Sequence, residues 1–312
     1  TVAVGAPEQG TLSVGTVHVY VRQGQTNWVR QQSLAGDSFF GGFGSDVDLL
    51  GDTLVIGEPL SDELGEAAGA ASVYVREGST WSRQALLLAD DGAAGDQFGR
   101  KVTVGDGVAA VHATFAGTNN AGAVYLFARE GTNWIAQGKL TKDEVGANGS
   151  FGWDLDLRGN LLLVGAKMHD GLGLNSGAAW LYRQEGTNWI ETASLWAGDG
   201  TAGDNYGCSI ALGEQYAAIG AEERIYGSQG YILNSQSGYN PRPWAQAMLV
   251  DGNVIWITFN DLDRLKTNRV EVSDNLAGNT WTVRESFVPD DSSAQIIWPA
   301  VSNAAYLRIS SP

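Results

Sequence analysis

Short apolar runs recur along most of the chain and predict β-strands. Segments such as TLVIGEP (53–59), ASVYVRE (71–77) and WSRQALLLA (81–89) alternate polar and apolar residues or stay apolar between turns of Gly, Asp and Asn. A period of two indicates a half-buried strand, and runs of about four to eight residues have the length of strands. No segment has the 3.6-residue apolar stripe of an amphipathic helix. The pattern therefore predicts an all-β protein.

The strands belong to an internal repeat, which three phased markers define. The first marker is a tryptophan that recurs at intervals of 53, 53 and 55 residues, at Trp28, Trp81, Trp134 and Trp189. The second is an aromatic residue followed by Gly, at Phe43-Gly44, Phe98-Gly99, Phe151-Gly152 and Tyr206-Gly207. The third resembles Gly-Ala-Pro, in VAVGAP (2–7), LVIGEP (54–59), LLVGAK (162–167) and AAIGAE (217–222). Because the markers keep a constant phase, they sample the same positions of one structural unit.

Each repeat predicts four short antiparallel strands, which we call A, B, C and D in chain order. Strand A follows the aromatic-Gly marker, strand B carries the Gly-Ala-Pro marker, and strand D carries the tryptophan. Four such strands in about 54 residues form one blade of a β-propeller, and stacking the blades buries faces that no single blade covers alone. The predicted repeats span about 1–37, 38–96, 97–148, 149–204 and 205–234, so the predicted propeller covers 1–234.

The markers resemble FG-GAP repeats, the blades of the integrin α-subunit propeller and of many secreted bacterial proteins. The resemblance implies an extracellular or cell-surface protein that binds another protein or a glycan, although a fold does not establish a function. The first repeat lacks strand A and the last lacks the tryptophan strand. We therefore expect further blades before Thr1 in a longer protein. The alternative is a ring of five blades that closes where the incomplete first and last repeats meet.

The repeat ends after Asn234, and a second domain is predicted. Residues 235–243 form a polar segment with two of the seven prolines of the chain, which is typical of a linker. The following segments read as further strands without the markers, so residues 244–312 are predicted to form a β-sandwich. By its pattern this module is similar to the fibronectin-III-like modules of secreted bacterial proteins.

The charge of the chain limits its partners. Lys and Arg total 19 against 35 Asp and Glu, which gives a net charge of −16 and argues against nucleic acid and anionic membranes as partners. No apolar run approaches the roughly 18 residues of a membrane span, so no membrane insertion is expected. A single cysteine, Cys208, excludes an internal disulfide and a cysteine-based zinc cluster, and we expect it to be a small buried residue.

Calcium is the cofactor that the resemblance suggests. Integrin-type blades carry an Asp-x-Asp-x-Asp-Gly loop between strands A and B, but here these connections are short turns, as in LLGDTL (49–54) and TVGDGV (103–108). No cofactor is therefore expected at these turns. The connectors at 89–96 and 197–204 could bind Ca²⁺ weakly through carboxylates at Asp90, Asp91, Asp96, Asp199 and Asp204. A turn role is favoured, in which Asp96 and Asp204 cap their loops.

Paired acids on strand A raise the alternative of an enzyme. Asp46 with Asp48, and Asp154 with Asp156, lie two residues apart and share one face of a strand, whereas Lys101 and Thr103 take these positions in the third repeat. Such pairs could serve a glycan hydrolase or lyase as acid and base at the propeller mouth. Solvated or hydrogen-bonded strand residues are the favoured interpretation, and no nucleophile or nucleotide-binding motif accompanies the acids.

Five residues are candidates for ligand contact because they break the repeat or lie in its loops. His112 replaces the Gly of the third Gly-Ala-Pro marker, and His169 lies in the loop at 167–177, which corresponds to the loop at 59–69. The chain has 11 tryptophans, of which the four repeated ones are interpreted as structural. Trp153 and Trp196 fall outside that register and, with Phe115, are candidates to stack on a ligand.

Three functions follow from these patterns. The favoured one is a non-catalytic extracellular recognition or adhesion module that binds protein or glycan through propeller loops. A secreted glycan-active enzyme is the second, and a structural spacer within a larger surface protein is the third. The sequence leaves the enzyme alternative open and favours the recognition module.

Overall fold

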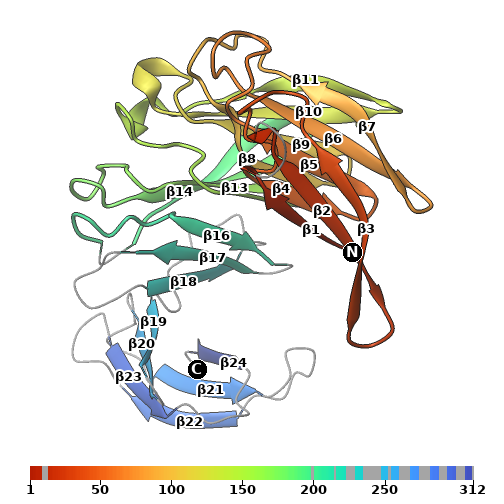
Figure 1. Ribbon diagram of the computed structural model, residues 1–312. Coiled ribbons are helices and arrows are strands. Elements are labelled where there is room, and N and C mark those ends of the chain that lie inside the picture. The colour runs from red at the N-terminus through yellow and green to blue at the C-terminus, as the bar shows by residue number, and fades with distance from the viewer. Residues whose placement is uncertain are drawn as a thin grey trace.

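The computed structural model describes residues 1–8, 13–197, 200–213, 216–222 and 229–234, and beyond these a set of six strands between residues 247 and 310. Figure 1 shows an all-β protein built from a series of antiparallel sheets. Short 3₁₀ segments, η2 (Thr118–Asn120) and η3 (Asp143–Val145), lie in loops. The predicted all-β class is confirmed.

Each repeat forms one sheet in which the strands follow the order of the chain. The first sheet contains β1 (Val2–Ala6), β2 (Thr16–Gln23) and β3 (Asn27–Ala35). The second contains β4 (Val47–Leu50), β5 (Thr53–Glu58), β6 (Ala70–Glu77) and β7 (Thr80–Leu87). The third contains β8 (Phe98–Gly105), β9 (Val108–Ala113), β10 (Ala123–Glu130) and β11 (Asn133–Leu140). The fourth contains β12 (Leu155–Arg158), β13 (Leu161–Ala166), β14 (Ala178–Glu185) and β15 (Asn188–Leu195).

The fifth sheet continues into the C-terminal part of the chain. It begins with β16 (Ser209–Leu212), β17 (Tyr216–Ala221) and β18 (Gln229–Asn234), and extends through β19 (Ala247–Asp251), β20 (Val254–Phe259) and β23 (Ala294–Pro299). A separate sheet contains β21 (Asn268–Ser273), β22 (Thr282–Phe287) and β24 (Tyr306–Ser310). β19 thus takes the place of the missing fourth strand. The linker at 235–243 lies outside the described residues, and the fibronectin-III-like module stays a prediction.

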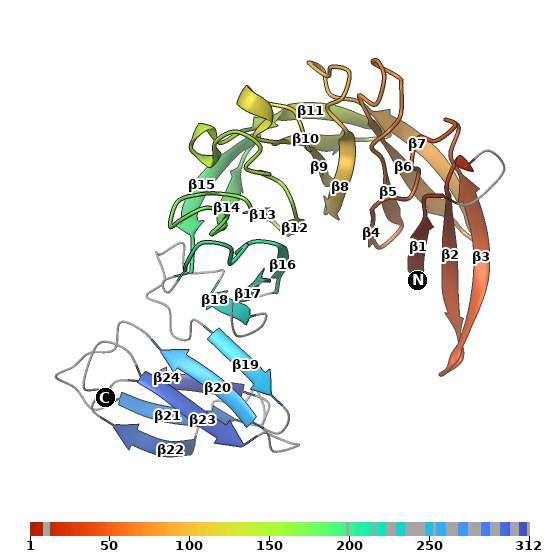
Figure 2. The same cartoon turned by 60° about the vertical axis from the view of Figure 1, so that its left-hand side comes forward.

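The five sheets are arranged along an arc (Figure 2). Strands β4, β8, β12 and β16, the A strands of their repeats, contact one another along its inner side. In the first sheet, which has no strand A, β1 contacts β4 instead. In the first four sheets, each pair of C and D strands has a β-bulge at the same position, for example between Val19 and Tyr20 in the first sheet and between Val73 and Tyr74 in the second. The regular geometry confirms that the markers define equivalent blades.

The glycines of the two markers meet at the junctions between sheets. A Cβ placed on Gly57 in β5 would lie 2.0 Å from the carbonyl oxygen of Gly99, the marker glycine of the next sheet. The equivalent approach is 2.1 Å between Gly5 and the Gly44 oxygen, and 2.2 Å between Gly165 and the Gly207 oxygen. These distances are far below a carbon–oxygen contact, so only glycine allows the backbones to come this close.

Aromatic residues of the second marker fill the junctions beside these glycines. Phe43, Phe98, Phe151 and Tyr206 are all at most 1% exposed. The Phe98 ring packs edge-on against Tyr125 at 5.3 Å, and the Phe151 ring packs edge-on against Trp180 at 5.6 Å. Apolar residues from the B, C and D strands complete each core, so the hydrophobic cores lie between sheets.

The glycine contact predicts a position-dependent cost for adding a single methyl group. Gly57→Ala is expected to destabilise the protein by about 1–3 kcal/mol, because the new Cβ must displace the next sheet. Urea unfolding followed by intrinsic fluorescence measures this change. Gly220→Ala is the matched control, because its Cβ would lie 3.4 Å from the nearest atom, the Ser209 oxygen. Equal losses in the two variants would contradict the junction role.

Candidate functional site

The paired acids of strand A accept hydrogen bonds from the backbone of the next sheet. Asp46 Oδ2 accepts a bond from Val102 N at 2.9 Å, and Asp48 Oδ2 accepts one from Val104 N at 2.8 Å. Two sheets further on, Asp154 and Asp156 accept the equivalent bonds from Ile210 N and Leu212 N. The hydrogen-bonded interpretation of these residues is therefore confirmed. Each pair of aspartates thus connects two A strands that belong to different sheets and do not pair with each other through backbone hydrogen bonds.

A lysine and a threonine continue the same connection in the third sheet. Lys101 Nζ lies 3.5 Å from Asp46 Oδ1 and 3.3 Å from Asp154 Oδ1, so it joins the acids of the sheets on both sides. Thr103 Oγ1 donates to Asp48 at 2.9 Å and accepts from Leu157 N at 3.1 Å. Burial raises the pKa of Asp46, although Lys101 opposes this shift. Burial alone would lower the pKa of Lys101, but Asp46 and Asp154 raise it above its ordinary value.

This arrangement assigns the acids a structural task. A carboxylate that holds backbone N–H groups of the next sheet is not positioned as one of two facing groups around a substrate bond. The enzyme alternative therefore gains no support from Asp46, Asp48, Asp154 or Asp156.

The acids of the connectors between sheets are engaged in a similar way. Asp96 Oδ2 accepts a bond from Ala93 N at 2.9 Å, and Asp204 Oδ2 accepts one from Thr201 N at 2.7 Å. The predicted capping role is confirmed for both residues. Asp91 accepts bonds from Lys139 Nζ and Tyr125 Oη, both at 2.8 Å, and these bonds lower the pKa of Asp91. Asp90 is exposed.

Calcium binding at these connectors stays a prediction. Asp199 lies outside the described residues, so the connector at 197–204 is only partly seen. Within the described part of the chain, no group of three or more His, Cys, Asp or Glu side chains is arranged to hold a metal ion.

His112 is buried at the junction between the third and fourth sheets. Its side chain is 1% exposed, and neither ring nitrogen has a hydrogen-bond partner among the described residues. The ring lies against Gly152, where a Cβ would approach its Cδ2 to 2.5 Å. Burial, with smaller contributions from Arg100 and Lys101, lowers the pKa of His112 from 6.5 to about 3. His112 thus fills the place of a marker glycine and is not at a surface.

His169 and Trp153 are also engaged by neighbouring residues. The His169 ring packs edge-on against Trp180 at 5.6 Å, at the base of its loop. Lys167 Nζ lies 3.7 Å from the centre of the Trp153 ring and 3.2 Å from Glu222 Oε1. Lys167 therefore covers one face of Trp153, and that face is not open for stacking on a ligand. Cys208, expected to be buried, is half-buried, and burial raises the pKa of its thiol.

Phe115 and Trp196 are the two exposed members of the predicted set. Phe115 is 40% exposed in the loop between strands β9 and β10, and Trp196 is 51% exposed in the connector after β15. The five predicted contact residues thus occupy buried junctions, loop bases and loop surfaces. They are not gathered into one described site.

Phe115, which the sequence indicated as a candidate, belongs to a row of apolar residues at the start of the B–C loops, and the other two members of that row were not predicted. Leu60, Phe115 and Met168 each lie three residues after the marker position occupied by Gly57, His112 and Gly165. Their exposed fractions are 44%, 40% and 38%, so three consecutive sheets present an apolar side chain at one equivalent position. The signal was available in the repeat, because an apolar residue recurs where a loop should begin with polar residues.

The loops of the second and fourth sheets have the same internal geometry. Asp62 Oδ1 accepts a bond from Ala67 N, and Asp170 Oδ1 accepts one from Asn175 N, both at 2.8 Å. Each loop is also bonded to the following connector, through Gly95 N to Glu66 O and Gly203 N to Leu174 O, again both at 2.8 Å. Equivalent leucines, Leu64 and Leu172, are 43% and 46% exposed. The B–C loops and connectors therefore form one ordered face, which we call the loop face.

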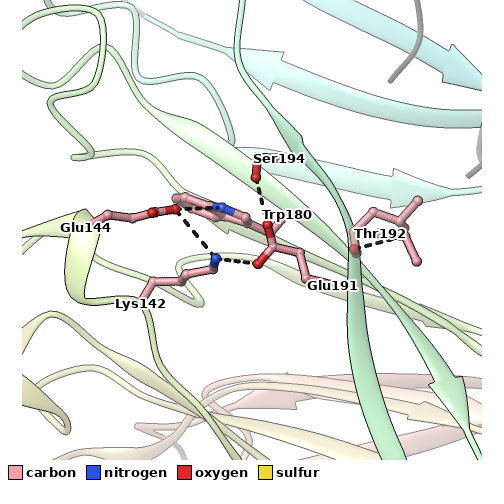
Figure 3. A network of polar contacts seen from close by, with 7 residues as sticks. Lys142, Glu144, Trp180, Glu191, Thr192 and Ser194 are labelled. Carbon is pink, nitrogen blue, oxygen red and sulfur yellow. Dashed lines mark hydrogen bonds and ion pairs between the residues drawn. The ribbon is translucent and has the colours of Figure 1, made fainter. Parts of the chain in front are cut away.

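A polar network fixes the connector between the third and fourth sheets (Figure 3). Lys142 pairs with Glu191 and lies 3.5 Å from Glu144 Oε1, and the Trp180 Nε1 group donates to the same oxygen at 3.2 Å. Lys142 Nζ also lies 5.6 Å from the centre of the buried Trp180 ring. Glu191 accepts a further bond from Ser194 Oγ at 2.7 Å. The network holds the connector against the sheet beneath the loop face.

The repeats form antiparallel sheets of up to four strands, and these sheets pack face to face through similar junctions. This arrangement is that of a propeller-like repeat protein. The model of the FG-GAP repeat family matches residues 33–74, 81–127, 134–182 and 189–237, which together make up more than half of the chain. The chain therefore belongs to the FG-GAP repeat family.

The chain was also compared with curated proteins and with solved structures. No curated protein matches the chain. The crystal structure of Saccharomyces cerevisiae Sqt1 matches with a TM-score of 0.38 and 10% identity, over 84% of each chain.

Asp48 and Asp52 lie in the same sheet, but replacing them is predicted to change the free energy of unfolding by different amounts. Asp48→Ala is expected to cost about 1–3 kcal/mol of unfolding free energy, because Val104 N and Thr103 Oγ1 lose their acceptor. Asp52→Ala removes an exposed pair with Arg76 and is expected to cost at most about 1 kcal/mol. Urea unfolding compares the two. A larger loss for Asp52→Ala would refute the assigned role of Asp48.

The burial of His112 predicts a loss of stability in acid. Because the folded-state pKa of about 3 lies below the ordinary 6.5, the unfolded chain binds the proton more readily over this range. The contribution of neutral His112 is complete above pH 6.5 and is lost as the pH falls towards 3, by up to about 1.4 kcal/mol per pH unit.

Chemical unfolding of the wild type and of His112→Leu between pH 4 and 7.5 tests this. The difference in unfolding free energy between them should change with pH, since leucine cannot titrate. A pH-independent difference would rule out His112 as the titrating group.

Proposed function

We propose that this protein is a non-catalytic extracellular recognition module that binds a protein partner through the loop face. The observation that carries the proposal is the row of Leu60, Phe115 and Met168, which repeats an exposed apolar side chain on three consecutive sheets. Exposed apolar residues are common singly, but their recurrence at one equivalent position of three consecutive sheets is what distinguishes this series. FG-GAP repeats are typical of extracellular proteins, which supports the location.

The charge around the row favours a basic partner. The B–C loops and connectors carry exposed carboxylates at Asp62, Glu63, Glu66, Asp90, Asp91, Asp143, Glu144 and Asp170. Their two lysines, Lys142 and Lys167, are held in ion pairs with glutamates. An acidic rim around apolar contacts complements a surface with Lys or Arg beside apolar side chains. Apolar contacts of this kind suit a polypeptide better than a sugar.

The remaining features of the site agree with binding by a rigid surface. The inner carboxylates are occupied by backbone N–H groups, and the loops are fixed by hydrogen bonds to the connectors. A preformed surface loses little conformational entropy when it binds. No helix in the described part of the chain is long and apolar enough to cross a membrane.

The test is binding of the purified full chain to arrayed extracellular-matrix proteins and glycans, with calcium and with chelator. A protein ligand is expected, with binding that weakens as salt increases because the rim is acidic. The triple variant Leu60→Ser, Phe115→Ser, Met168→Ser is expected to raise the Kd of that ligand by about tenfold or more.

A matched variant separates the loop face from general surface hydrophobicity. Leu86, Ile135 and Ile190 are 37%, 43% and 46% exposed on the D strands of the same three sheets. Replacing these three by Ser should leave the Kd unchanged. Loss of binding in the D-strand variant alone would refute the loop face as the site, glycan binding would refute the protein partner, and silence of the whole array would favour a spacer. Loss under chelator would show that a cation takes part.

A further inference from the structure

One of the four junctions between the repeat sheets is built differently from the other three. Two marker glycines approach each other closely between the first and second, the second and third, and the fourth and fifth sheets. Between the third and fourth sheets the strand B position is His112, whose ring lies against Gly152. A side chain at this position excludes the close backbone approach that glycine allows. We call this contact the His112 junction.

The A strands are also joined less firmly at the His112 junction. At the junctions on either side of it, two carboxylates accept hydrogen bonds from backbone N–H groups of the next sheet. Here these positions are Lys101 and Thr103, and the Thr103 hydroxyl accepts one backbone bond, from Leu157 N at 3.1 Å. Lys101 has no acceptor and pairs with Asp154 at 3.3 Å. A neutral hydroxyl is a weaker acceptor than a carboxylate, so the tie between these two strands is weaker.

The outer side of the junction lacks a bond that the two preceding junctions have. Trp134 Nε1 donates to Gln84 Oε1 of the preceding sheet at 3.1 Å, and the equivalent bond joins the first and second sheets. Trp189 has Gln137 at the equivalent position of its preceding sheet, but its Nε1 group is buried without a hydrogen-bond partner among the described residues. The inner strands, the marker position and the outer strands therefore all depart from the repeat at this one junction.

Buried polar atoms without a hydrogen-bond partner gather at the same place. In the part of the chain that the structure describes, they are Nδ1 and Nε2 of His112, Oγ1 of Thr114, Nδ1 of His169 and Nε1 of Trp189. Trp189 packs into the core between the third and fourth sheets, His169 packs edge-on against Trp180 of that core, and Thr114 lies two residues after His112. Such atoms cost free energy while they are buried and recover it when water reaches them.

We propose that the His112 junction is a hinge in the repeat array, which opens in preference to the other junctions, and that acid promotes this opening through His112. In the closed form the ring is 1% exposed and packed between two sheets. Opening brings water to the ring and allows it to bind a proton, and the charged imidazole then opposes closure.

The groups around His112 set the direction of the acid effect. Burial, with smaller contributions from Arg100 and Lys101 of β8, lowers the pKa of His112 to about 3. On the other sides, β10 and the fourth sheet place Val124 and Gly152 beside the ring. An exposed imidazole has its ordinary pKa of 6.5, so the open form binds a proton that the closed form does not. Between pH 7 and pH 5 this favours the open form by about twentyfold.

Acid has the opposite effect on the neighbouring junctions. Burial raises the pKa of Asp46, which joins the second and third sheets, and of Asp156, which joins the fourth and fifth. A raised pKa means that the closed form binds the proton more tightly than an open form would, so acid does not favour opening there. The sign of the effect therefore selects the His112 junction.

The hinge also affects the loop face. Phe115 follows β9 in the third sheet and Met168 follows β13 in the fourth, so the two residues begin loops on opposite sides of the His112 junction. Opening changes the distance between these two members of the apolar row. This consequence rests on the proposed function, whereas the hinge itself is tested without any ligand.

Amide hydrogen exchange of the full chain, followed residue by residue, tests the hinge. Leu157 N at the His112 junction and Val104 N at the preceding junction occupy equivalent positions on strand A. At pH 7 the protection factor of Leu157 is expected to be at least about tenfold lower than that of Val104. At pH 5 it should fall by about a further twentyfold, while that of Val104 changes less than about threefold. Equal protection at pH 7, or a parallel fall of both amides, would overturn the proposal.

A matched pair of variants tests the part played by His112. His112→Leu removes the titrating ring and should abolish the pH dependence of Leu157 protection, whereas His18→Leu in β2 of the first sheet should leave it as in the wild type. An acid response that persists in folded His112→Leu would refute the role of His112. If His112→Leu does not fold, the comparison of Leu157 with Val104 in the wild type decides the proposal.

Discussion

The structure depends on the close approach of two backbones at three of the four junctions between its five repeat sheets. The glycine of one marker lies against the carbonyl of the next marker glycine, as Gly57 does against Gly99, and no larger residue fits without displacing a sheet. The aromatic residue before the second glycine then fills the adjoining core, as Phe98 does. Two sequence markers that seem independent are therefore the two halves of one contact, which explains why they keep a constant phase.

Polar groups on the inner strands extend this contact from one sheet to the next. Asp46 and Asp154 serve the backbone of the following sheets, and Lys101 offsets part of their charge. Because the inner side is used in this way, the exposed loops are the surface to which we assign the proposed recognition. The loops can carry it because hydrogen bonds to the connectors hold them, so the apolar row of Leu60, Phe115 and Met168 keeps its spacing.

The junctions also explain why residues at equivalent positions of different sheets differ in their surroundings. His112 stands where other repeats have glycine, and the third sheet accepts it at the expense of an unpartnered imidazole. Val4 and Ile56 occupy equivalent positions, yet one is exposed and the other is buried. A solenoid-like repeat derives its stability from neighbouring units, so its outermost faces differ from its interior ones although the residues are alike.

The sequence by itself determined the strands, their grouping into blades and the capping role of Asp96 and Asp204, because these depend on alternation, turn chemistry and contacts within a few residues. It also determined the family, since the markers repeat in phase. The tertiary structure alone decided that Asp46 and Asp48 serve the next sheet, that His112 is buried and that Lys167 covers one face of Trp153. Each of these facts concerns residues of different blades, and the distance between blades is set by backbone packing that no local pattern records.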